Sequence, residues 1–227
     1  MIRLASTLFV IAASVFAASA QQVKPLVVSP DQPVPNDDRG QAFILTADLQ
    51  PLSSFGHLRK TSNFEPQQYS IFVGERWTDP ALQLRETRLQ SLLANVSNEA
   101  DLIALEEIGI KNRFGPTASL EQAAASPEPF TDLGAQRMIA ALLSEGLLPR
   151  PNSKAIYVIF LDAGRESTLG SLVGGKHFAA YHGVFNSSGA RIRYAVVPFT
   201  ADEATAYQIA LRIFVAAALR PAHTSAK

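Results

Sequence analysis

The sequence predicts a single layered α/β domain, with α+β as the alternative, in which helices flank a mixed sheet of about four strands. Three observations lead to this fold class. The unbroken apolar run at 156–161 is typical of a strand that is covered on both faces. Helix-like patterns lie before and after this run. Two more strand patterns, at 178–185 and 191–199, flank the turn cluster NSSGA and indicate an antiparallel hairpin.

Helix start signals place the other elements in order. A short apolar run at 69–74 predicts the first clear strand. Asp79, with a proline directly after it, predicts the N-cap and the first turn of a helix. Asn98 and Thr131 predict the starts of two more helices. The last helix, 202–220, is apolar nearly all round, which is typical of a helix buried in the domain.

The N-terminus has the pattern of a secretory signal peptide. Arg3 precedes an apolar run at 8–16, and small residues lead up to Ala20, after which we expect cleavage. The alternative is an uncleaved membrane anchor, but the run is short compared with the roughly 20 residues that span a bilayer. We therefore assign residues 1–20 to a signal peptide and expect a soluble, exported chain without a stable anchor, secreted or, in a Gram-negative bacterium, periplasmic.

The rest of the chain divides into three parts. Residues 21–68 begin proline-rich and are expected to form a partly disordered lead-in, although the segment 41–49 also fits a short strand. Residues 69–221 are expected to form the domain, with a loop at 110–130. Residues 222–227 are expected to form a tail. The length that remains after the signal peptide suits one domain.

Composition excludes several classes of function. The chain has 20 basic and 20 acidic residues and no block of like charge, so it lacks the electrostatic footprint of a protein that binds nucleic acid or anionic lipid. It has no cysteine, which excludes cysteine nucleophiles, thiolate zinc sites and iron–sulfur clusters. An exported chain without disulfides must be stabilised by its core.

The stretch GGKHFAAYHGVF contains two of the four histidines, His177 and His182. Side chains alternate along a strand, so an odd separation places the two on opposite faces and argues against a local metal pair. The acids nearby in sequence are Asp162 and Glu166, which are candidates for a metal site that also uses His182. His182 and the neighbouring Tyr181 are also the candidates for a catalytic site. The alternative, which an isolated histidine without partner groups favours, is that both residues simply pack on a half-buried strand.

Four segments in order match a known family: YSIFVGERWTDPALQLRETRLQSLL, FTDLGAQRMIAALLSEGLLPRPNSKAIYVIFLDAG, GGKHFAAYHGVF and RIRYAVVPF. Their order and spacing resemble the secreted Exordium-like proteins, also called the phosphate-induced protein family, and in particular the bacterial branch. The matched region covers somewhat more than half of the chain. The resemblance implies an extracellular location, and it matches His182 to the histidine of the family's F-C-x-Y-H segment.

The resemblance fails in the last helix. In bacterial relatives the corresponding segment looks like a helix that bears S-H-E-x-x-E-x-x-T-D-P and resembles a metal-hydrolase helix. Its histidine and acidic residues would form a metal site together with the strand histidine. Here Arg212 and apolar neighbours stand at the place of the His-Glu pair, Val215 or Ala216 stands where the second acid would fall, and LRP replaces TDP. Ala179 replaces the cysteine of F-C-x-Y-H. The partners that the resemblance implies for His182 are therefore missing.

We therefore expect a secreted, non-enzymatic or catalytically degenerate member of this family, without a cofactor. The first alternative is a secreted metal-dependent hydrolase or peptidase, which would use zinc, His182 and the remote acids named above. The second alternative is an extracellular protein that binds a cell-wall sugar or peptide, with Trp77, Tyr181 or Tyr194 stacking on the ligand.

Overall fold

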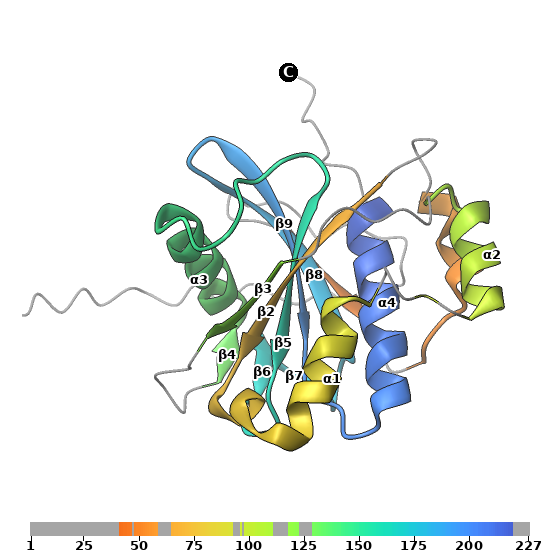
Figure 1. Ribbon diagram of the computed structural model, residues 1–227. Coiled ribbons are helices and arrows are strands. Elements are labelled where there is room, and N and C mark those ends of the chain that lie inside the picture. The colour runs from red at the N-terminus through yellow and green to blue at the C-terminus, as the bar shows by residue number, and fades with distance from the viewer. Residues whose placement is uncertain are drawn as a thin grey trace, which may run out of the picture.

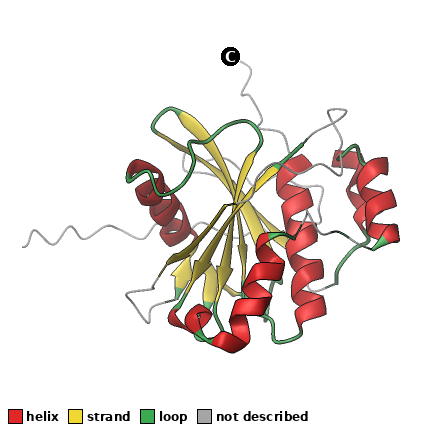
Figure 2. Ribbon diagram, in the orientation of Figure 1, coloured by secondary structure: helices red, strands yellow, loops and turns green. Residues whose placement is uncertain are grey.

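The computed structural model describes residues 41–46, 48–58, 65–92, 96, 98–110, 118–122 and 129–219. The expected signal peptide (1–20) and tail (222–227) lie outside these residues. Within them the chain has the predicted α/β fold, in which a mixed sheet lies between helices on both faces (Figure 1). Figure 2 shows the same layers coloured by secondary structure.

The large sheet contains six strands among the described residues. Their spatial order is β1 (Gln41–Leu45), β8 (Ala180–Ser187), β9 (Ala190–Val197), β5 (Ala155–Leu161), β2 (Gln67–Val73) and β3 (Ala118–Gln122). The strands from β9 to β3 run parallel, whereas β8 is antiparallel to both of its neighbours. A second sheet contains β4 (Phe130–Thr131), β6 (Ser167–Leu169) and β7 (Leu172–Val173), and it lies near the carboxyl ends of the parallel strands (Figure 1).

Helices cover both faces of the large sheet. One face is covered by α1 (Pro80–Gln90) and α4 (Glu203–Leu219), which lie side by side (Figure 1). Outside them, α2 (Glu99–Glu107) packs on η1, a 3-10 helix at Leu52–Leu58, which in turn packs on α4. The opposite face is covered by α3 (Asp132–Ser144). A second 3-10 helix, η2 (Glu75–Thr78), connects β2 to α1.

Three helices start where the sequence predicts. The side chains of Asp79, Asn98 and Thr131 each accept a hydrogen bond from a backbone N–H in the first turn of α1, α2 and α3, at 2.9, 3.1 and 3.0 Å. These bonds satisfy N–H groups that have no partner within the helix. The three caps therefore mark where α1, α2 and α3 begin.

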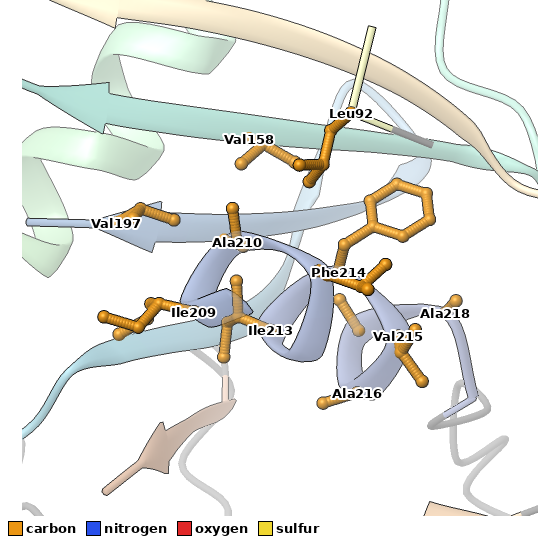
Figure 3. Close-up of a cluster of buried hydrophobic side chains, with 14 of the residues drawn as sticks. Leu92, Val158, Val197, Ile209, Ala210, Ile213, Phe214, Val215, Ala216 and Ala218 are labelled. Atoms are coloured by element: carbon orange, nitrogen blue, oxygen red, sulfur yellow. The ribbon is translucent and has the colours of Figure 1, made fainter. Parts of the chain in front are cut away.

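The core on one face of the sheet is centred on α4. Every buried residue of this helix is apolar, from Ala206 to Leu219. Figure 3 shows Ala210 and Phe214 pointing from α4 toward Val158 of the sheet and Leu92. Burying a large apolar side chain stabilises a fold by about 1.5 to 3 kcal/mol. The apolar pattern that predicted a buried helix at 202–220 is therefore explained by its position against the sheet.

The structure corrects the sequence prediction in three places. The large sheet has six strands among the described residues, not about four. η1 lies within 21–68, which was expected to be a lead-in, and β3 lies within the expected loop 110–130. β1 confirms the short strand that the segment 41–49 also fits. β3, an edge strand in the described part of the sheet, has the sequence ASLEQ, which carries no apolar run. No helix in the described part of the chain is both long enough and apolar enough to span a membrane.

Candidate functional site

The two histidines of GGKHFAAYHGVF lie in different environments. β8 begins at Ala180, so His177 lies in the turn before it. His177 is exposed, and its Nδ1 accepts a hydrogen bond from the backbone N–H of Val173 at 2.9 Å. His182 lies inside β8 and is only 3 % exposed. His177 and His182 therefore lie apart because His177 precedes the start of β8. They are not two positions on one strand, so strand alternation does not apply to them.

His182 and Tyr181 face opposite sides of the sheet, because adjacent side chains alternate along β8. Tyr181 belongs to the buried cluster on the α3 side. Ala180, which shares a face with His182, belongs to the cluster on the α4 side. The two residues that the sequence offered as candidates for one catalytic site thus lie in two separate cores.

The cross-strand neighbours of His182 are apolar. Its ring stacks on Phe43 of β1, with 5.0 Å between the ring centroids and 22° between the planes. Its partner across the β8–β9 ladder is Ala195. The face on which it lies is covered by α4, whose buried side chains are all apolar. α4 therefore offers His182 no carboxylate or imidazole as a second metal ligand.

The acids proposed as remote partners do not converge on His182. His182 pairs with Ala195, and Ala195 pairs with Val158 of β5. Asp162 lies four residues further along the chain from Val158, which places it about 16 Å from His182, given about 4.8 Å between strands and 3.3 Å per residue. Glu166 is exposed in the connection between β5 and β6. Within the described ranges, no three His, Asp or Glu side chains come together in a group that could hold a metal ion.

Asp162 instead binds the backbone at the carboxyl ends of β2 and β5. Its carboxylate accepts hydrogen bonds from the N–H groups of Arg76 and Gly164, at 3.0 and 3.1 Å, and the residue is 5 % exposed. Gly74 adopts a φ of 126°, and a Cβ there would overlap the carboxyl group of Asp162. Only glycine fits this place without strain. The structure therefore gives Asp162 the role of joining two loops.

Tyr181 lies in a buried polar cluster that ties α3 to the sheet. The Tyr194 hydroxyl donates a hydrogen bond to Oδ1 of Asp132, in the first turn of α3. Nε2 of Gln136 donates to Oδ2 of Asp132 at 2.8 Å and to the Tyr194 hydroxyl at 3.2 Å. The rings of Tyr181 and Tyr194 meet edge to face at 6.4 Å. The Tyr181 hydroxyl is buried without a hydrogen-bond partner among the described residues.

Burial controls protonation in this cluster. Burial raises the pKa of the Asp132 carboxyl above its ordinary value, and hydrogen bonds from Tyr194 and Gln136 counteract part of this rise. Burial also raises the pKa of Tyr181 and of Tyr194 well above the usual range, and the nearby charge of Asp132 adds to the effect. Both phenols therefore stay neutral at physiological pH, and the Tyr194 hydroxyl donates to the carboxyl group.

The sequence analysis did not single out Asp132 or Gln136. They are four residues apart on α3, so they lie on one face of the helix. A polar pair at this spacing, at the start of a helix whose buried face is otherwise apolar, is the signal that would have identified them. Their contact with Tyr194 spans about sixty residues of chain and has no local sequence signature.

The aromatic residues proposed to stack on a ligand belong to the core. Trp77 is 1 % exposed, and Tyr181 and Tyr194 are 0 % exposed. Side chains without accessible surface cannot stack on a ligand, so the packing alternative holds for all three.

A pocket of about 570 Å³ lies between α1, α4 and the start of α2. Its size falls within the range of about 300 to 1,000 Å³ that is typical of small-molecule sites. Apolar surface comes from Leu89, Ala204 and the half-buried Tyr207. Polar side chains from the same three helices complete the lining: Arg85, Arg88, Asn98, Glu203 and Gln208.

Comparisons with known proteins identify no relative of this chain. No family model matches it, no curated protein matches it, and no solved structure matches it. Membership of the Exordium-like family therefore stays a prediction based on the segments quoted above.

Proposed function

We propose that the chain is an exported, non-enzymatic protein of the Exordium-like type that acts by binding an extracellular ligand. The observation that carries this proposal is the environment of His182. This histidine stacks on Phe43 and lies on the sheet face that is covered by the apolar side of α4. Such surroundings suit a packing residue better than a metal ligand, because catalytic zinc needs three convergent protein ligands.

The position of Asp162 supports the same proposal. A hydrolase that used His182 would need remote acids to reach it, and Asp162 is the most buried of the acids suggested. Its carboxylate is already engaged by two backbone N–H groups at the other end of the sheet. Recruiting it to a metal near His182 would break both hydrogen bonds and move a loop. Binding therefore fits the geometry better than metal-dependent hydrolysis.

The pocket between α1 and α4 is the candidate site for the proposed binding. It combines an aromatic ring with polar side chains from three helices, and small-molecule sites commonly combine apolar walls with a few polar groups. His182 lies on the sheet and is not among the residues that line this pocket. Ligand binding there does not require His182.

A peptide hydrolysis assay with added zinc tests the proposal. The purified exported chain, the His182→Ala variant and the His177→Ala variant should all give the rate of the protein-free control on a fluorogenic peptide mixture. The exposed His177 is the matched control, because it lies in the same stretch of sequence. Zinc-dependent hydrolysis that is lost in His182→Ala and kept in His177→Ala would overturn the proposal.

A further inference from the structure

We infer that the pocket between α1, α4 and the start of α2 binds a neutral saccharide, with one sugar ring lying against Tyr207. This inference rests on the proposed binding function and assigns its ligand class. A pyranose ring has apolar C–H faces and a rim of hydroxyl groups that both donate and accept hydrogen bonds. A suitable site therefore needs an aromatic wall, a balanced set of donors and acceptors, and little net charge.

The charged side chains of the pocket already have contacts within the protein, although Nε of Arg85 is buried without a hydrogen-bond partner among the described residues. Arg88 forms an ion pair with Glu203 across the space between α1 and α4. Arg85 is 7 % exposed, donates to two backbone carbonyls in the segment before α4, and lies 4.6 Å above the ring of Phe199. A charged ligand would have to compete with these contacts. A neutral ligand can use the remaining hydrogen-bonding capacity without breaking them.

The two helix N-termini at the pocket are also neutralised. Asn98 caps α2, and acidic residues occupy the first turn of that helix. The Asp202 carboxylate accepts a hydrogen bond from the N–H of Thr205 at 2.7 Å at the start of α4, and Glu203 follows it. Carboxylates at these places offset the partial positive charge that would otherwise attract an anion. Anionic sugars and phosphates are therefore disfavoured relative to neutral ones.

Tyr207 provides the aromatic wall. Its ring packs on the core cluster on one side and lines the pocket, so it is supported from behind. Burial raises the pKa of Tyr207, and the charge of Asp101 raises it further, so the hydroxyl stays protonated and able to donate. Leu89 and Ala204 extend the apolar surface. A ring with an apolar face and a polar tip suits a ligand of the same mixed character.

Planar polar groups stand beside this ring in fixed orientations. Nε2 of Gln208 donates to Oδ2 of Asp101 at 3.2 Å, and Oε1 of Gln208 accepts from Arg212. Arg88 offers donors and Glu203 offers acceptors from opposite walls. Neighbouring sugar hydroxyls match such paired planar groups, because each hydroxyl is both donor and acceptor. Orientation before binding lowers the entropic cost of association.

Calorimetric titration of the full exported chain tests the inference. The probes are three neutral tetrasaccharides, namely cellotetraose, chitotetraose and xylotetraose, with tetragalacturonic acid and tetra-alanine as the acidic-sugar and peptide arms. We expect at least one neutral sugar to bind. Tyr207→Leu should weaken that binding about tenfold or more, since it removes the flat ring. Tyr207→Phe should weaken binding less than Tyr207→Leu, since it keeps the ring and loses only the hydroxyl donor.

Two further variants keep the test decisive. Leu133→Ala, at a 49 % exposed position on α3 away from the pocket, should leave the Kd unchanged. Glu203→Gln replaces one carboxylate acceptor with an amide donor, and it removes the charge that pairs with Arg88 without touching the core. It should weaken binding severalfold, so it replaces Tyr207→Leu if that variant does not fold.

Four outcomes would overturn the saccharide assignment: no sugar binds, only the acidic sugar binds, only the peptide binds, or affinity is the same in every variant. Product analysis of the bound sugar separates the two proposals. An intact sugar agrees with both. A sugar that is cleaved, and whose binding depends on Tyr207, would contradict the non-enzymatic function and support the pocket.

Discussion

Replacing Asp162 by alanine should destabilise the fold without any loss of bound metal. The substitution removes two hydrogen bonds from a carboxylate that is 5 % exposed, those to the N–H groups of Arg76 and Gly164. A hydrogen bond to a charged group contributes about 1.5 to 3 kcal/mol. Removing the buried charge regains part of this loss, since burying a charge costs free energy. We therefore expect the free energy of unfolding to fall by roughly 3 to 4 kcal/mol, more than the roughly 0.5 to 3 kcal/mol of most single substitutions.

Chemical denaturation and thermal unfolding measure this effect. For a chain of this size, 1 kcal/mol corresponds to about 2 to 4 °C in Tm, so the Asp162→Ala variant should melt about 10 °C lower. Glu166→Ala is the matched control, because Glu166 is an exposed acid in the same connection, and its change should stay within about 0.5 kcal/mol. If the two variants are equally stable, the carboxylate of Asp162 does not hold the two loops together and this reasoning is refuted.

Three further predictions concern other buried contacts. Gly74→Ala should cost at least about 3 kcal/mol in urea denaturation, because φ is 126° and the new Cβ would overlap Asp162; an unchanged midpoint would refute this. Gly183→Ala should also destabilise, because its Cβ would lie 2.6 Å from the Tyr194 ring, which calorimetry can measure. The folded-state pKa of Asp132 is raised, so unfolding free energy should fall as pH rises from the ordinary carboxyl pKa through the raised one. Asp132→Asn should lack that slope, and an identical pH profile would contradict the assignment.

The central part of the fold could be predicted from the sequence because it depends on local patterns. The apolar run at 156–161 required a strand covered on both faces, and it became part of β5 in the middle of the sheet. Asp79, Asn98 and Thr131 marked helix starts because capping is a local interaction. β3, at the edge of the described sheet, has the sequence ASLEQ and carries no such apolar run, so the sequence did not identify it.

The candidate site was less predictable because it depends on which layer covers each face. Alternation along a strand placed Tyr181 and His182 on opposite faces as soon as both belonged to β8. Strand alternation did not indicate that the face with Tyr181 meets the polar start of α3 or that the face with His182 meets the apolar side of α4. Tyr207 belongs to the helix at 202–220, for which the apolar pattern predicts burial, and its place in a pocket depends on how α1 packs beside α4.

The distinction between packing and catalysis at His182 has a general physical basis. A histidine that acts on a metal needs other ligands within bonding distance, and those ligands need hydrogen bonds of their own. The stacked ring of Phe43 and the apolar side of α4 supply neither. Burial of an imidazole is therefore not by itself an indication of a metal centre, even where a family resemblance makes the residue prominent.

Zinc stoichiometry tests the account most directly. The purified chain, produced in zinc-supplemented medium and dialysed against metal-free buffer, is analysed by plasma mass spectrometry beside His182→Ala and the exposed control His177→Ala. The account predicts that all three retain far less than one zinc per chain. One zinc per chain in the wild type and in His177→Ala, with none in His182→Ala, would contradict it.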